Sequence, residues 1–105
     1  MLLEIEYKNK KLERQCTIYK EAVRSYGKDM AVKIEQVIGE LEAADSVNFL
    51  EKHSISRCHA LIGNRKGEFA MDLVHPFRLV FEKKENTIEL KRVEMVKVTD
   101  IINYH

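Results

Sequence analysis

The first half of the chain passes from a strand-like to a helix-like pattern of apolar residues. Residues 2–7 alternate in part between apolar and acidic side chains, which predicts a short strand. Between Lys8 and Tyr26 the apolar side chains recur every three or four positions, which draws one stripe along a helix. The stripe consists of Leu12, Cys16, Tyr19, Val23 and Tyr26. Gly27 stands where a glycine commonly ends a helix, and similar spacing over 29–44 completes a predicted helix hairpin.

The second half of the chain has the alternating pattern of strands. It follows a polar connection at 45–56, which holds a small apolar cluster of Val47, Phe49 and Leu50. Strands are predicted at 58–62, 68–74, 77–82 and 87–98, with turns at 63–67, 75–76 and 85–86. The order predicts an α+β fold of one domain over residues 1–105. An N-terminal strand and the helix hairpin are expected to pack on one face of a small antiparallel sheet (β-α-α-β-β-β).

The alternation over 77–82 separates a buried face from a candidate functional face. Successive side chains of a strand point to opposite faces, so if its apolar positions face the helices, Arg78 faces away from them. Lys66, in a turn between glycines, and the terminal Tyr104 and His105 are expected on the same side. The sequence therefore predicts a polar site on the face away from the helices.

Composition and charge narrow the classes of function. The chain is 45% hydrophobic and 33% charged, as in ordinary folded domains, and no window approaches the roughly 18 apolar residues of a membrane span. The N-terminal residues do not fit a signal peptide, so Cys16 and Cys58 are expected to be reduced thiols in the cytoplasm. Basic residues gather in 1–28 and 52–105, whereas 29–51 is acidic. With a net charge of +1, any affinity for RNA must come from a local patch and a larger partner.

A metal centre or other cofactor is not predicted. Cys58 and His59 are neighbours, so on a strand they point to opposite faces, and the other histidines show no paired ligand spacing. Cys16 lies on the apolar stripe and is expected to be a small core residue.

Four segments follow one another in the second half of the chain. They are Arg57-Cys58-His59-Ala60-Leu61, Gly63-Asn64-Arg65-Lys66-Gly67-Glu68-Phe69, Pro76-Phe77-Arg78-Leu79-Val80-Phe81 and Asn103-Tyr104-His105. In order and spacing they resemble the HigB-type killer toxins of the RelE/ParE superfamily. Three positions depart from the family pattern: Asn103 replaces an aspartate, Ala60 replaces a proline, and His75-Pro76 replaces a glycine-asparagine turn.

The resemblance implies the toxin of a bacterial toxin–antitoxin pair. Such toxins are ribosome-dependent endoribonucleases that cut translated mRNA, and a helix-turn-helix (HigA-type) antitoxin holds them inactive. Carried over by position, the catalytic residues are His59, Lys66, Arg78, Tyr104 and His105. Because Asn103 replaces the aspartate of the family pattern, a carboxylate that could take part in proton transfer is missing at this position.

These residue types suit RNA cleavage without a metal. The 2′-hydroxyl attacks the adjacent phosphate, which requires a base, an acid for the leaving 5′-oxygen and cations for the developing charge. Imidazoles titrate near neutral pH, so His59 and His105 suit the base and acid roles, although the sequence does not say which takes which. Arg78 can hold two phosphate oxygens, and Tyr104 can stack on a base. Further RNA contacts are expected from Arg65 and Lys66 in the turn and from the first helix, at Lys8, Lys11 and Arg14.

Simpler interpretations stand beside these. His59 can be satisfied by a backbone carbonyl, Arg78 can pair with Glu68 or Glu82, and Tyr104 can cap the edge of the core. Two other functions also remain open: a ParE-like toxin that binds DNA gyrase without chemistry, and an inactive remnant that binds only its antitoxin. The histidines favour the nuclease, because a pure binder needs no acid–base groups.

Overall fold

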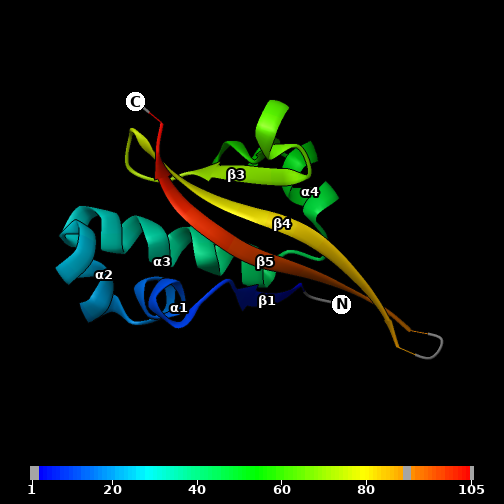
Figure 1. Ribbon diagram of the computed structural model, residues 1–105, viewed down its shortest axis with the longest axis horizontal. Helices are drawn as coiled ribbons and strands as arrows, with labels where there is room; N and C mark the ends of the chain where they lie inside the picture. The colour runs from blue at the N-terminus through cyan, green and yellow to red at the C-terminus, as the bar shows by residue number, and fades with distance from the viewer. Residues whose placement is uncertain (1–2, 89–90, 105) are drawn as a thin grey trace.

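Helices cover one face of a β-sheet in the computed structural model of the chain (Figure 1). The backbone is described for residues 3–88 and 91–104, and the side chains for 3–84 and 94–104. The helices are α1 (Lys10–Thr17), α2 (Tyr19–Tyr26), α3 (Lys28–Ala43) and α4 (Val47–Lys52), with short 3-10 helices η1 (Ile55–Arg57) and η2 (Gly63–Arg65). The strands are β1 (Glu4–Tyr7), β2 (His59–Ala60), β3 (Glu68–Asp72), β4 (Phe77–Ile88) and β5 (Lys91–Asn103).

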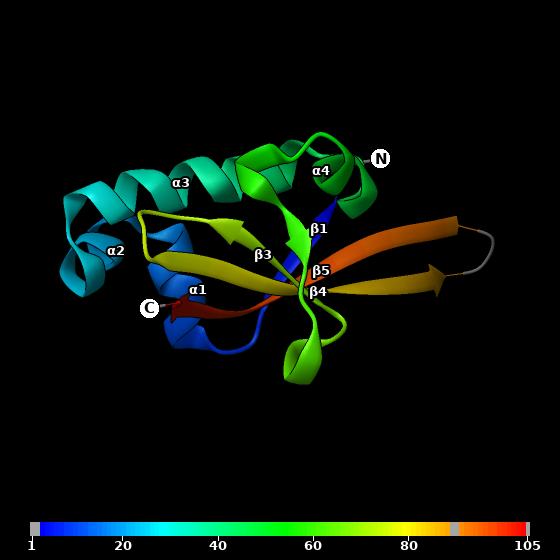
Figure 2. The same ribbon diagram turned by 90° about the horizontal axis from the view of Figure 1, so that it is seen from above.

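The sheet has the strand order β1-β5-β4-β3-β2, so β1 and β2 are its two edges. The helical segment between them carries the chain across the whole sheet (Figures 1 and 2). The predicted α+β class is therefore confirmed. The sheet is mixed rather than wholly antiparallel, because β1 pairs parallel to β5, with Glu4 opposite Met95 and Tyr7 opposite Val98. The other strand pairs are antiparallel.

The main core lies between the sheet and the helices. Leu79 and Phe81 of β4 are fully buried there against helical residues such as Ile34 and Leu41. On the opposite face, Leu61, Ala70 and Val80 form a smaller buried cluster. We call this second side the open face of the sheet. The prediction that the apolar positions of β4 face the helices is confirmed, and Arg78, two residues before Val80, lies on the open face.

The single helix predicted over 8–26 is wrong, because the helix breaks at Ile18. This residue is extended, with φ −115° and ψ 107°, and it separates α1 from α2. The break shifts the helical phase, so Tyr19 of the predicted stripe is 43% exposed and Ala22 is buried in its place. Gly27 ends α2 with φ 92°, as predicted, a conformation that glycine adopts without steric cost.

Two predicted connections are also corrected. The polar connection contains α4, whose one-turn spacing buries Val47 and Leu50 and leaves Phe49 46% exposed. The turn predicted at 85–86 is wrong, since β4 continues to Ile88 and pairs with β5 from Lys91 onward. β5 then runs through the predicted end of its strand at 98 as far as Asn103. The two strands form a long hairpin that projects from the body of the molecule (Figure 2).

Candidate active site on the open face of the sheet

Arg78 lies at the start of β4, where β3 ends and β5 ends beside it. In the sheet register Arg78 stands opposite Asp72, and its Nε lies 3.3 Å from Asp72 Oδ1. The other side of the guanidinium lies over the Tyr104 ring, with Cζ 3.9 Å from the ring centroid. The Tyr104 backbone N–H donates to the carbonyl of Pro76 at 3.0 Å, which fixes the backbone of Tyr104 just after the end of β5. Arg78 is therefore in contact with both a carboxylate and an aromatic ring.

A second arginine, which the sequence does not single out, shares the same carboxylate. Arg57 donates from Nε to Asp72 Oδ2 at 2.7 Å and from Nη2 to Oδ1 at 3.4 Å. The hydrogen bond from Asp72, with its charge, raises the pKa of Arg57 above its ordinary value. The alternatives Glu68 and Glu82 for the partner of Arg78 are thus wrong, since Asp72 is the residue that faces it.

These residues border a cavity of about 330 Å³. Its lining includes Arg57, Asp72, Arg78, Tyr104 and the exposed His75. The sequence places His75 only in the turn at 75–76, and its position at the cavity follows from the tight β3–β4 connection. An open cavity with two guanidinium groups, an aromatic ring and an imidazole has the chemistry of a phosphate and base site.

His59 lies on the edge strand β2, two strands across the sheet from Arg78 on β4. It stands opposite Ala70 in the register, so it shares the open face, and it is half-buried. Its Nδ1 lies 2.7 Å from the carbonyl oxygen of Arg57. Because a carbonyl can only accept, Nδ1 carries the hydrogen, and Nε2 of the neutral ring is left as the acceptor. The carbonyl partner that the simpler interpretation expects is therefore present, and it sets which ring nitrogen carries the hydrogen.

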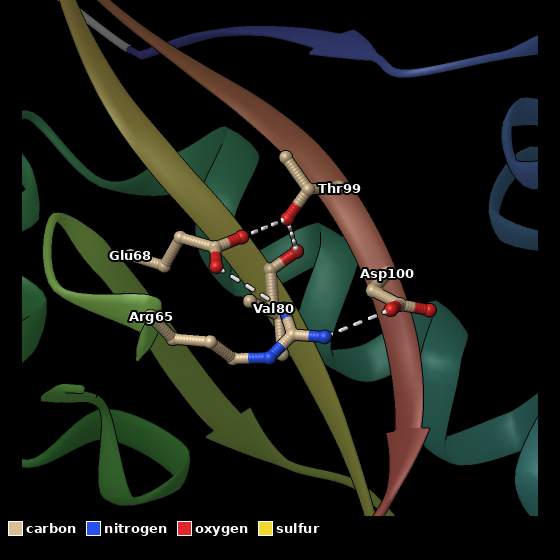
Figure 3. Close-up of polar contacts among 5 residues, drawn as sticks. All are labelled: Arg65, Glu68, Val80, Thr99 and Asp100. Atoms are coloured by element: carbon tan, nitrogen blue, oxygen red, sulfur yellow. Dashed lines mark hydrogen bonds and ion pairs between the residues drawn. The ribbon is translucent and has the colours of Figure 1, made fainter. Parts of the chain in front are cut away.

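Arg65 is held in the middle of the open face by two carboxylates (Figure 3). From η2 its guanidinium crosses β4 and pairs with Glu68 at 3.1 Å and Asp100 at 3.2 Å. Burial lowers the pKa of Arg65, but the hydrogen bonds and charges of Asp100 and Glu68 outweigh it and raise this pKa. Thr99 donates from Oγ1 to Glu68 Oε2 at 2.6 Å and completes the network. Lys66 follows on the end of η2 and is exposed.

A β-bulge in β5 makes this network possible. The register steps from Val80 opposite Asp100 to Phe81 opposite Val98, so Thr99 is an extra residue. The bulge lets Thr99 and Asp100, which are neighbours, both face Arg65 and Glu68. The bulge is visible in the sequence pattern. The residues that face the helices are two positions apart at Val96 and Val98, but the next one, Ile101, follows after three positions.

The other predicted RNA contacts lie away from the Arg78 cavity. Lys8 borders a separate depression of about 350 Å³ together with Arg65, Lys97 and Asp100. Lys11 and Arg14 are exposed on α1. His105 lies outside the described residues. The structure thus brings Arg78 and Tyr104 together at one end of the open face. His59 does not line their cavity, and it stands in the same row of the sheet as Val80 and Asp100, where Arg65 lies. The functional roles of all these residues stay predictions.

Neither cysteine has the surroundings of a nucleophile. Cys16 and Cys58 are buried, and burial raises the pKa of each thiol to about 12. In the part of the chain that the structure describes, no group of three or more His, Cys, Asp and Glu is arranged to hold a metal ion. Among the described helices, none is long and apolar enough to cross a membrane.

Helices on one face of a mixed sheet, with the first strand beside the last, define a RelE/YoeB-like α+β fold. Two solved structures show it over the whole chain. The YoeB/ParE toxin from Agrobacterium tumefaciens has a TM-score of 0.60 and 11% identity, covering 98% of this chain and 100% of that chain. A chain of the YoeB–YefM complex from Staphylococcus aureus has a TM-score of 0.60 and 22% identity, covering 100% and 99%.

No protein-family model matches the sequence, and no curated protein matches it. At the identities of the two solved structures, the likeness is one of fold. The fold expected from the four sequence segments is therefore confirmed, and the HigB-type assignment within it stays a prediction.

Proposed function

We propose that the chain is the toxin of a type II toxin–antitoxin pair and acts as a HigB-type, ribosome-dependent mRNA endoribonuclease. The observation that carries the proposal is the Arg78 guanidinium, held between Asp72 and the Tyr104 ring at the cavity of the open face. The fold shared with YoeB/ParE toxins supports it. The chain acts as a single domain in the cytoplasm and needs no metal or other cofactor.

The proposed reaction is an attack of the RNA 2′-hydroxyl on the adjacent phosphorus. His59 Nε2 and His105 share the roles of base, which takes the hydroxyl proton, and acid, which protonates the departing 5′-oxygen. Arg78 and Lys66 stabilise the negative charge that builds on the phosphate oxygens, and Tyr104 stacks on a base or contacts the phosphate. The Nδ1 contact of His59 with the Arg57 carbonyl supports a base role for His59, because it leaves Nε2 free to accept.

The proposed partners are the ribosome with its mRNA and a cognate antitoxin. One of the similar structures is a YoeB–YefM complex, which supports an antitoxin partner for this chain as well. A helix-turn-helix antitoxin of the HigA type is the finer part of this proposal. Lys8, Lys11, Arg14 and Arg65 are proposed contacts to RNA phosphates, with the charge of Arg65 largely balanced by Glu68 and Asp100.

Primer extension on a defined mRNA in a translation reaction tests the function. Wild type should give discrete cuts, and Arg78→Ala and His105→Ala should abolish them. Arg24→Ala is the matched control, because Arg24 is an exposed arginine on α2 that pairs with Glu21 away from the cavity. Cuts that persist in Arg78→Ala would contradict the proposed site.

Two further arms separate the alternatives. Efficient cleavage of protein-free mRNA at physiological salt would contradict ribosome dependence. Growth arrest without any cuts, together with inhibition of DNA gyrase, would replace the nuclease with a ParE-like binding function. An absence of both toxicity and cuts, with intact antitoxin binding, would identify a remnant.

A further inference from the structure

We propose that Arg57 is a second phosphate-binding residue of the Arg78 cavity and that Asp72 is the positioning residue that holds the two guanidinium groups side by side. The ligand is the phosphodiester backbone of single-stranded RNA, so this inference rests on the proposed function and refines its substrate site. Both residues lie outside the set of catalytic and RNA-binding residues predicted from the sequence.

The geometry of one carboxylate carries the first part of the argument. Asp72 Oδ1 lies 3.4 Å from Arg57 Nη2 and 3.3 Å from Arg78 Nε, so a single oxygen bridges the two side chains. Two guanidinium groups so close together would otherwise repel each other. One carboxylate against two arginines leaves a net charge of +1 at the cavity wall. The wall therefore complements an anion, and guanidinium groups favour the oxygens of phosphate.

The two arginines differ in exposure, which places Arg57 at the outer side of the site and Arg78 at the inner side. The Arg57 side chain is 58% exposed and that of Arg78 is 24% exposed. An exposed ion pair contributes little to the stability of the fold, so stabilisation alone does not account for the Arg57–Asp72 pair. It is well placed as the outer half of a binding site, where a strand of RNA meets Arg57 before the phosphate held by Arg78.

The backbone at Arg57 supplies an independent observation. Arg57 has φ 55°, and the nearby Ser54 and Ser56 have φ 52° and 44°, which are left-handed values uncommon for residues other than glycine. Such conformations persist where the surroundings enforce them, and they gather at functional sites. Ser56 Oγ donates to Glu40 Oε1 at 2.5 Å and ties the segment to α3. The strained segment presents the Arg57 side chain to Asp72 and its carbonyl to the His59 ring.

Arg57 thereby connects the two predicted catalytic side chains. Its carbonyl fixes the His59 ring, and its guanidinium reaches Arg78 through Asp72. Binding of a phosphodiester at Arg57 is consequently coupled to the orientation of both groups.

The first test measures binding without cleavage. The probe is a fluorescent eight-nucleotide 2′-O-methyl RNA, which lacks the attacking hydroxyl, titrated at several salt concentrations and followed by anisotropy. Arg57→Ala should weaken binding about tenfold and reduce the salt slope by about 0.7, the contribution of one phosphate contact on a single strand. Arg57→Lys keeps the charge without the forked geometry and should recover part of the affinity. Arg24→Ala, an exposed and ion-paired arginine on α2, should bind as wild type does.

The second test separates the positioning role of Asp72 from a structural one. Asp72→Asn removes one negative charge, so the probe should bind at least as tightly as to wild type and with a steeper salt dependence. In the translation reaction the same variant should cut at least tenfold more slowly, since Arg78 and Arg57 are no longer held together. A merely structural Asp72 would instead weaken both binding and cutting.

The outcomes keep the two proposals apart. Equal affinity of wild type and Arg57→Ala for the probe overturns the inference even where wild type cleaves mRNA. Weaker binding by Asp72→Asn overturns the positioning role. Binding that depends on Arg57 in a protein that never cuts mRNA supports this inference and removes the proposed nuclease function alone.

Discussion

The planar guanidinium of Arg78 is matched to its two neighbours in a way that another cation cannot reproduce. Its Nε lies 3.3 Å from Asp72 Oδ1, and its Cζ lies over the Tyr104 ring, 3.9 Å from the centroid. A lysine ammonium keeps the charge but loses the flat face and the forked donors.

Arg78→Lys is therefore expected to lower mRNA cleavage about 100-fold or more while leaving the fold intact, as expected for loss of an oriented charge at a transition state. Cleavage is measured by primer extension, and the fold by circular dichroism. Activity of Arg78→Lys close to that of wild type would show that charge alone is sufficient and would contradict the importance of the stacked geometry.

The buried thiols give a prediction about pH. Burial raises the pKa of Cys16 and of Cys58 from 9.0 to about 12. Well below pH 9 both thiols are protonated in the folded and unfolded chains, so their ionisation does not change the free energy of unfolding. Between about pH 9 and 12 the unfolded chain loses protons that the folded chain keeps, and the free energy of unfolding falls.

Two measurements check this behaviour. At pH 8 the native protein should react slowly with a thiol reagent, and both cysteines should react at once in denaturant. Urea unfolding between pH 8 and 11 should show a smaller loss of stability in Cys58→Ala than in wild type. Rapid reaction of the native protein would contradict the buried, protonated state.

At this scale the sequence predicts side-chain types better than their partners. It assigns Arg78 to the open face, because alternation along a strand is local. It does not find Asp72 as the partner, since that pairing depends on the register between β3 and β4. The sequence does not predict a role for Arg57 for the same reason, because its side chain pairs with Asp72 on β3, outside its own segment.

Among the elements, α1 depends on a short-range cap. Asn9 accepts a hydrogen bond on Oδ1 from the Leu12 backbone N–H at 2.8 Å and begins the helix. Asn9→Ala should lower the free energy of unfolding by about 1 kcal/mol, measured by urea denaturation. Asn9→Asp is the control, because a carboxylate oxygen can make the same bond and also suits a helix N-terminus. Equal loss in both variants would mean that the loss does not come from the cap hydrogen bond to Leu12.

The lengths of the elements show where sequence patterns stop being informative. Residues 85–86 have turn-like side chains, yet the pairing of β4 with β5 carries the strand past them to Ile88. The break at Ile18 likewise runs against an uninterrupted helical pattern. For β4 the long-range strand pairing overrides a local preference, whereas nothing in the structure explains the break at Ile18. The bulge at Thr99 belongs here too, because one extra residue resets the alternation of the last strand.

For the molecule as a whole, the helices protect one face of the sheet and leave the other to the site. Phe81 is fully buried in the main core, whereas Val80 lies in the small cluster on the open face. Phe81→Ala should lower the free energy of unfolding by about 3–5 kcal/mol, a large part of the stability of a small domain. Val80→Ala should cost clearly less, because its cluster is small and fewer methyl groups are removed. Thermal melting of both variants checks the ranking, and a larger loss for Val80→Ala would contradict it.

The place of β5 in the sheet also governs the order in which the protein can be made. β5 lies between β1 and β4, so the first strand gains its only partner in the described sheet from residues 95–98. A growing chain can form its helices early, but β1 waits unpaired until residues 95–98 have been synthesised. Tyr104, which completes the Arg78 cavity, arrives later still. The candidate catalytic end of the sheet is thus assembled after the helices, and a chain that stops before Tyr104 is without it.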